Sequence, residues 1–125
     1  MAEFGERLTY TMKAAADLSA VQYHIVRRSA AGVTNIASLA TNTAMIGVLQ
    51  NKPAAENRAA TIAYAGLSKV VAGTNAVTDG DLITTNGSGR ADVAGSGDMV
   101  CGRALSTSAN DGEVITAVLY PPYKL

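Results

Sequence analysis

The chain contains one histidine and one cysteine, the side chains that most often act as general base, nucleophile or zinc ligand. His24 lies in the run Tyr23–Val26, whose residue types favour a β-strand, so a structural or surface histidine is the simpler interpretation. Cys101 has the apolar neighbours of a small buried side chain, and as the only cysteine it excludes an internal disulfide. Any Ser-His-Asp arrangement therefore depends on His24 alone, and a zinc site would need two carboxylates as well.

Acidic residues beside glycines are common both in calcium-binding loops and in tight turns. Here they are Asp79, Asp81, Asp98, Asp111 and Glu113. Their spacing matches no twelve-residue calcium loop that ends in a bidentate glutamate, whereas capping of turn N–H groups accounts for each of them. The two Gly-Ser-Gly stretches lack the Gly-Lys-Ser/Thr that follows in a phosphate-binding loop. We expect no catalytic residue, no cofactor and no metal, and therefore a protein that is not an enzyme.

The overall charge argues against several classes of partner. The 125 residues include 10 Lys and Arg and 10 Asp and Glu, so the net charge of zero offers no attraction for nucleic acid. Charged residues make up 16%, below the roughly 25% of a typical soluble domain, and such a surface tends to associate with others. No apolar stretch approaches the length of a membrane span, and the first ten residues do not resemble a signal peptide. We therefore expect synthesis in a reducing cytosol and no membrane partner.

Turn signals recur every eight to twelve residues, and the apolar runs between them are short, which is typical of an all-β barrel or sandwich. A short turn or single helical turn is expected near Asp17, an exposed loop over 51–58, and a bend at Gly66-Leu67. In the first half of the chain the predicted strands are 8–12, 22–28, 33–37, 45–49, 59–65 and 68–73.

The second half has stronger turn signals. Thr78–Asp81 predicts a turn, and Asn86-Gly87 and Asn110-Asp111-Gly112 predict hairpins. Pro121-Pro122 should end the last strand and leave a five-residue tail, for which solvation is favoured over a contact. The strands predicted between these signals are 81–85, 90–93, 99–105 and 113–120.

Short motifs follow one another in a fixed order along nearly the whole chain. They are Phe4–Tyr10, Ile46–Pro53, Ala60–Gly66, Ser68–Gly73, Val77–Asp81, Ser88–Ala91, Gly97–Leu105 and Asp111–Ile115. In this order they resemble the family of capsid cement, or head decoration, proteins of tailed bacteriophages. One stretch departs from the family, because relatives often carry a compact glycine-bearing turn where this chain has Glu56-Asn57-Arg58.

The resemblance implies a structural virion protein, made in the bacterial host cytoplasm, that binds the outside of an assembled capsid. It would stabilise the shell by bridging subunits of the major capsid protein, with no nucleic acid, membrane or small-molecule partner. A homotrimer is expected by analogy with decoration proteins at threefold positions. The expected fold is all-β: a small single-domain β-barrel, or a β-tulip or β-clip-like sandwich. It would have at most one short helix and an extended N-terminal arm.

Residues 1–12 form either that arm or a first strand, followed by a β-rich domain over 13–125. The candidates for a capsid or oligomer interface are Phe4, Leu8, Tyr10 and Met12. These apolar residues alternate with polar ones over 8–12, as they would in a strand added to the exposed sheet edge of a partner. The alternative is that residues 8–12 are simply the first strand of the domain itself, and both interpretations stay open.

Two other functions compete with a decoration protein. One is a small β-clip-like module that binds a sugar or metabolite, although such pockets usually use aromatic side chains and this chain has no Trp and one Phe. The other is a minor tail or head-joining component of the same virion. Shell binding at one copy per capsid subunit would favour the decoration protein over both.

Overall fold

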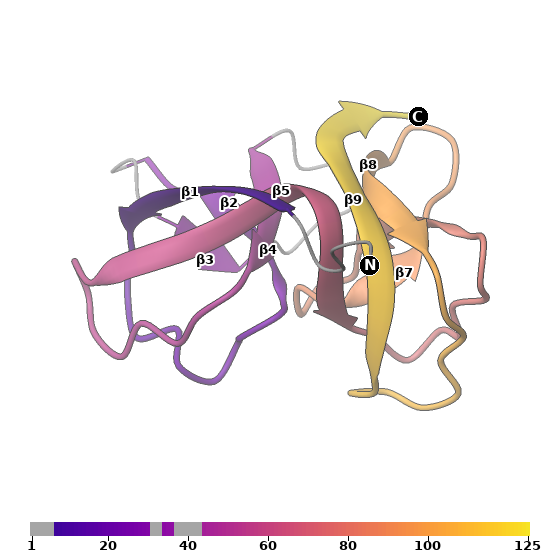
Figure 1. The fold of residues 1–125 in the computed structure, drawn as a ribbon, viewed down its shortest axis with the longest axis horizontal. Helices are drawn as coiled ribbons and strands as arrows, with labels where there is room; N and C mark the ends of the chain where they lie inside the picture. Colours follow the sequence, from indigo (N-terminus) through magenta and orange to yellow (C-terminus); the bar gives the residue numbers. More distant parts are fainter. Residues whose placement is uncertain (1–6, 31–33, 37–43) are drawn as a thin grey trace, which may run out of the picture.

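The computed structural model describes residues 7–30, 34–36 and 44–125, and within these ranges it is all-β, with nine strands and no helix (Figure 1). This confirms the expected fold class. The strands are β1 (Arg7–Lys13), β2 (Ile25–Arg28), β3 (Thr34–Ile36), β4 (Met45–Leu49), β5 (Ala59–Val71), β6 (Leu82–Thr85), β7 (Ala91–Val93), β8 (Met99–Ala104) and β9 (Val114–Lys124).

The strands form one antiparallel sheet in the order β3-β2-β4-β5-β9-β8-β6-β7, with β1 also paired to β5. The long strand β5 therefore belongs to two parts of the molecule. Its first residues pair with β1 and β4, and its last residues pair with β9. The exchange occurs at Gly66, which pairs with both Arg7 and Leu119 and has a φ of 94° that glycine adopts readily. We call β1 to β4 the N-terminal half and β6 to β9 the C-terminal half; they lie side by side along the long axis (Figure 1).

The C-terminal half closes into a small barrel. A parallel bridge joins Ala72, just after β5, to Ala91 of β7, and the N–H of Gly73 donates to the carbonyl of Ala91 at 2.9 Å. The last strand of the series β5-β9-β8-β6-β7 thus returns to the first, which leaves little exposed edge in this half. Its interior is filled by small and branched side chains: Val70, Val77, Ile83, Cys101, Ala104, Ile115, Ala117 and Leu119.

The same hydrophobic cluster continues into the N-terminal half through Ile25, Met45, Val48 and Ala63, so the two halves share one core. A second, smaller cluster lies within the N-terminal half alone. It consists of Ala14, Leu18, Val26, Leu49, Ala60 and Ile62, with Met12, Val21 and Ile46 packed against it.

The predicted turns are confirmed in the C-terminal half. Oδ1 of Asn86 accepts from the N–H groups of Ser88 and Arg90, and this turn joins the antiparallel strands β6 and β7. Three of the five acidic residues cap backbone N–H groups as expected: Asp81 accepts from Thr78 N, Asp98 from Gly95 N and Glu113 from Ala109 N. The carboxylate of Asp111 instead pairs with the guanidinium of Arg90.

The prediction that Pro121-Pro122 ends the last strand is wrong. β9 runs on to Lys124, which pairs with Met99, and the backbone of Leu125 is bonded to Asp98. The register between β8 and β9 shifts between Val100 and Gly102, so that 120–122 lie opposite a single residue. A proline at such a bulge need not donate a ladder hydrogen bond, which is why the strand continues past it.

Two details of the N-terminal half differ from expectation, the start of β2 and the continuity of β5, while the turn near Asp17 is one of the two expected alternatives. β2 begins at Ile25 rather than at residue 22, because Tyr23 has a φ of 65° that interrupts an extended strand. The stretch around Asp17 is a turn without helix, in which the carboxylate accepts from the N–H and hydroxyl of Ser19. Gly66 bends β5 without dividing it. In the loop at Glu56-Asn57-Arg58, where the sequence differs from the family that it resembles, Asn57 adopts a positive φ of 71°, which asparagine tolerates better than most residues.

Gly102 of β8 should not tolerate a side chain. A Cβ at this position would overlap the carbonyl oxygen of Val118 and lie 3.1 Å from Cα of Leu119, and neither backbone atom can move aside easily. Gly102→Ala should lower the free energy of unfolding by about 1–3 kcal/mol, the usual range for overpacking, in a urea titration. The control is Gly95→Ala, whose nearest contact would be Oδ2 of Asp98 at 3.6 Å; an equal loss in both variants would contradict this packing.

Candidate interaction surface

β1 is a strand of the domain with one neighbour. It pairs with β5 from Arg7 opposite Gly66 to Lys13 opposite Ala59, and within the described ranges no other strand pairs with it. Residues 8–12 therefore form the first strand of the domain itself rather than a separate arm. Figure 1 shows β1 alongside the first part of β5. Phe4 lies outside the described residues, and an interface role for Leu8, Tyr10 and Met12 stays a prediction.

The apolar side chains of β1 are arranged as one face. Strand alternation places Leu8, Tyr10 and Met12 on the same side, and Leu8 is 58% exposed. Tyr10, 37% exposed, stacks on Tyr64 of β5 with 5.0 Å between ring centroids. Its hydroxyl donates to the carbonyl of Ile46 in β4 at 3.0 Å. We call Leu8, Tyr10, Met12, Ile46 and Tyr64 the β1 face.

Tyr10 is held in place as a neutral donor. Burial and the neighbouring Tyr64 raise the pKa of Tyr10, and Arg28 opposes this shift. The phenol therefore keeps its proton throughout the physiological range, and its bond to Ile46 does not depend on pH there. Because stacking and the hydrogen bond fix both ends of the ring, Tyr10 presents a rigid apolar surface beside the exposed Leu8.

Shallow hollows flank the β1 face. One is lined by Tyr10, Met12 and Arg28, and its neighbour shares Arg28 and reaches Ile46. A third, at the start of β1, is lined by Arg7 and Leu8 together with Ala65 and Gly66. All are open to solvent rather than enclosed, so the surface suits an extended protein segment better than a small ligand, which usually binds in a deep pocket.

The edge of β1 that no described strand pairs with has little of the protection that edge strands usually carry. Native proteins blunt such edges with charged residues, proline or bulges, because an exposed edge pairs readily with another chain. The five residues from Leu8 to Met12 include no charge and no proline, and the cations Arg7 and Lys13 stand only at the strand ends. The one irregularity in pairing with β5 lies between Leu8 and Thr9. This edge is therefore suited to adding a strand from a partner.

The two reactive side chains are not presented to solvent. Both ring nitrogens of His24 are engaged, with the carbonyl of Gln22 and the guanidinium of Arg90. Cys101 is buried in the barrel, where burial raises the pKa of its thiol to about 12. In the part of the chain that the structure describes, no three His, Cys, Asp or Glu side chains come together as a metal site.

Three members of this surface were missed by sequence reasoning. They are Tyr64, Ile46 and Arg28, which sequence patterns placed only within the predicted strands 59–65, 45–49 and 22–28. No local signal could link them to β1, because β1 and β4 meet across β5, far apart in the sequence.

Comparison with models of known protein families finds no matching family, and comparison with curated proteins finds no matching protein. Over residues 7–30, 34–36 and 44–125, the structure has no helix with the length and hydrophobicity needed to cross a bilayer.

The thiol of Cys101 should be inert in the folded protein. With a pKa near 12 and a side chain inside the barrel, it is neither ionised nor accessible at neutral pH. A colorimetric thiol reagent should therefore detect no cysteine in the native protein and one per chain after unfolding in guanidinium. Rapid labelling of the native protein would show that the barrel interior is open to solvent.

Proposed function

We propose that this chain is a non-enzymatic structural protein of a virion, a capsid decoration protein that binds the outside of a tailed-phage head. Two lines of support meet here: the order of sequence motifs along nearly the whole chain, and an association surface on an all-β scaffold. The single observation that carries the proposal is the second edge of β1, which no strand of the described residues pairs with, and the 58% exposed Leu8 beside it. Exposed apolar surface next to an unpaired strand edge is costly in a protein that stays alone, and useful in one that binds another protein.

The placement of the aromatic residues agrees with a contact function. None of the five tyrosines, at positions 10, 23, 64, 120 and 123, is fully buried. Tyrosine combines a large apolar ring with a polar end, and it is enriched where proteins meet. In this chain the core is made of smaller residues, and the rings remain at or near the surface.

The physical effect on a shell follows from linkage. A protein that binds only the assembled capsid lowers the free energy of the assembled state, and bridging two capsid subunits opposes their separation. Many copies on one shell multiply this effect. The net charge of zero is compatible with dense coverage of the shell, since neighbouring copies of the protein do not repel one another strongly. A homotrimer, with the major capsid protein as partner and the capsid exterior as location, completes the proposal.

Replacing Leu8 by aspartate should weaken binding to empty phage heads that lack the protein. The substitution puts a charge on the exposed side chain of the β1 face, and loss of one buried leucine in an interface corresponds to about tenfold or more in affinity. The measurement is cosedimentation with heads over a range of protein concentrations. Wild-type protein should saturate near one copy per capsid subunit.

The matched control is Val114→Asp, since Val114 is 50% exposed on β9 in the other half of the molecule. It should bind like the wild type, and circular dichroism should show both variants folded. No saturable binding of wild-type protein to heads would overturn the proposal, and specific glycan binding instead would favour the sugar-binding module. Saturation at a handful of copies per head would favour a joining protein. If both substitutions weakened binding to heads equally, β1 would not be the interface.

A further inference from the structure

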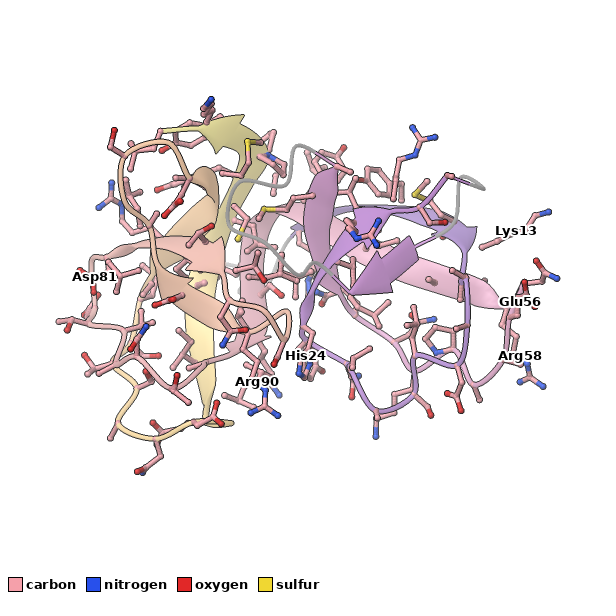
Figure 2. All side chains as sticks on the ribbon, turned by 180° about the vertical axis from the view of Figure 1, so that it is seen from behind. Lys13, His24, Glu56, Arg58, Asp81 and Arg90 are labelled. Carbon is pink, nitrogen blue, oxygen red and sulfur yellow. The ribbon has the colours of Figure 1, made fainter. Side chains whose placement is uncertain are left out.

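The imidazole of His24 connects the two halves of the molecule. Its side chain is 7% exposed, and Figure 2 shows it beside Arg90 between the halves. Nδ1 of His24 lies 3.1 Å from the carbonyl oxygen of Gln22, and Nε2 lies 3.4 Å from Nε of Arg90. A carbonyl oxygen only accepts, so Nδ1 carries the proton and Nε2 accepts from the guanidinium. This arrangement requires a neutral ring.

The backbone around His24 is bonded to both halves as well. On the side of the N-terminal half, Tyr23 N donates to the carbonyl of Leu49 at 2.7 Å, and Leu49 N donates to that of His24 at 3.0 Å. Toward the C-terminal half, Val71 N donates to the carbonyl of Tyr23 at 3.0 Å.

Ile25 adds a further bond across the junction, since its N–H donates to the carbonyl of Gly89, in the turn before β7, at 2.7 Å. We call residues 23–25 the joint. Tyr23 holds a positive φ of 65°, a conformation that costs free energy and persists only where surrounding contacts enforce it. The joint is therefore a place where lost contacts can change the structure.

The charges around His24 favour its neutral form. Arg90, the cation in contact with the imidazole, pairs with Asp111 at 2.9 Å. Beside the neighbouring residue Tyr23, Nζ of Lys69 in β5 lies 5.7 Å from the ring centroid. Among the described residues, none places a carboxylate in hydrogen-bond contact with the imidazole. A proton added to Nε2 of His24 would therefore face the guanidinium of Arg90.

We propose that His24 is a pH-sensitive latch between the two halves. When Nε2 gains a proton, it can no longer accept from Arg90, and two positive charges face each other. The joint then loosens, while β5 keeps its pairing in both halves. This inference goes beyond the proposed function and does not rest on it, because it concerns the isolated protein.

The direction of the pH effect follows from the same groups. Burial, together with the charge of Arg90, lowers the pKa of His24, while hydrogen bonds to the carbonyls of Gln22 and Val21 act in the opposite sense. An opened joint binds its proton at the ordinary pKa of about 6.5, and the closed joint only at lower pH. The closed joint is therefore most stable above about pH 6.5. It loses stability as the pH falls from there through the lowered pKa of His24 in the closed joint.

Hydrogen exchange of single amides should show the latch. Between about pH 7.5 and pH 5, the opening constants of the Ile25 and Val71 amides should rise by up to about tenfold per pH unit below pH 6.5, after correction for intrinsic exchange. The buried Ala104 amide, bonded to Asp81 within the barrel, is the internal control and should not share this rise. In His24→Gln, whose side chain cannot titrate, the extra rise should vanish.

A second measurement uses the fact that the chain has one histidine, whose ring resonance is unambiguous in an NMR titration. The midpoint should lie below the ordinary value and move up in Arg90→Gln. Arg103→Gln, which removes an arginine bonded to Gly80 and Tyr120 instead, should leave it unchanged. A wild-type midpoint at or above the ordinary value would overturn the latch, as would an Ile25 amide no more pH-dependent than Ala104. If His24→Gln does not fold, the wild-type and Arg90→Gln titrations still decide the question.

Discussion

β5 has to satisfy the backbone hydrogen bonds of two halves at once, and this requirement shapes the whole molecule. A strand has two edges, and over its thirteen residues β5 is paired with β1, β4 and β9. Buried N–H and C=O groups that lose their partners cost free energy, so neither half can give up its share of β5. Gly66 marks the place where the partners change, and its backbone conformation permits the bend that turns one strand into a member of both halves.

The composition of the core follows from the small size of the barrel. Five strands leave a narrow interior, which is filled here by Val, Ile, Leu, Ala, Met and one Cys rather than by aromatic rings. The tyrosines consequently lie outside the fully buried core, and Tyr10 and Tyr64 stack on each other in the N-terminal half. The C-terminal half is a closed barrel, whereas the N-terminal half has the edge of β1 that no described strand pairs with, and this half carries the surface suited to a partner.

This division gives the joint at residues 23–25 its significance. Under the proposed function, a partner contacts the β1 face, and any force on that face reaches the barrel through β5, through the shared hydrophobic core and through the joint. The hydrogen bonds of Tyr23 and Ile25 and the contact between His24 and Arg90 are the polar part of this connection, beside the continuous strand.

The sequence by itself determined the all-β class, most strands and the main turns, because these depend on local signals. Alternation located β1, Asn86 located a hairpin, and acidic residues near glycines located turns that their own side chains cap. The same local reasoning failed at Pro121-Pro122, since only the register between β8 and β9 shows that a bulge relieves the prolines of ladder pairing. It also left open whether residues 8–12 were an arm or a strand. That choice, the stacking of Tyr10 on Tyr64, and the meeting of His24 with Arg90 were decided by tertiary structure. Each joins residues more than forty positions apart, and no pattern within one segment can specify which distant segment will lie beside it.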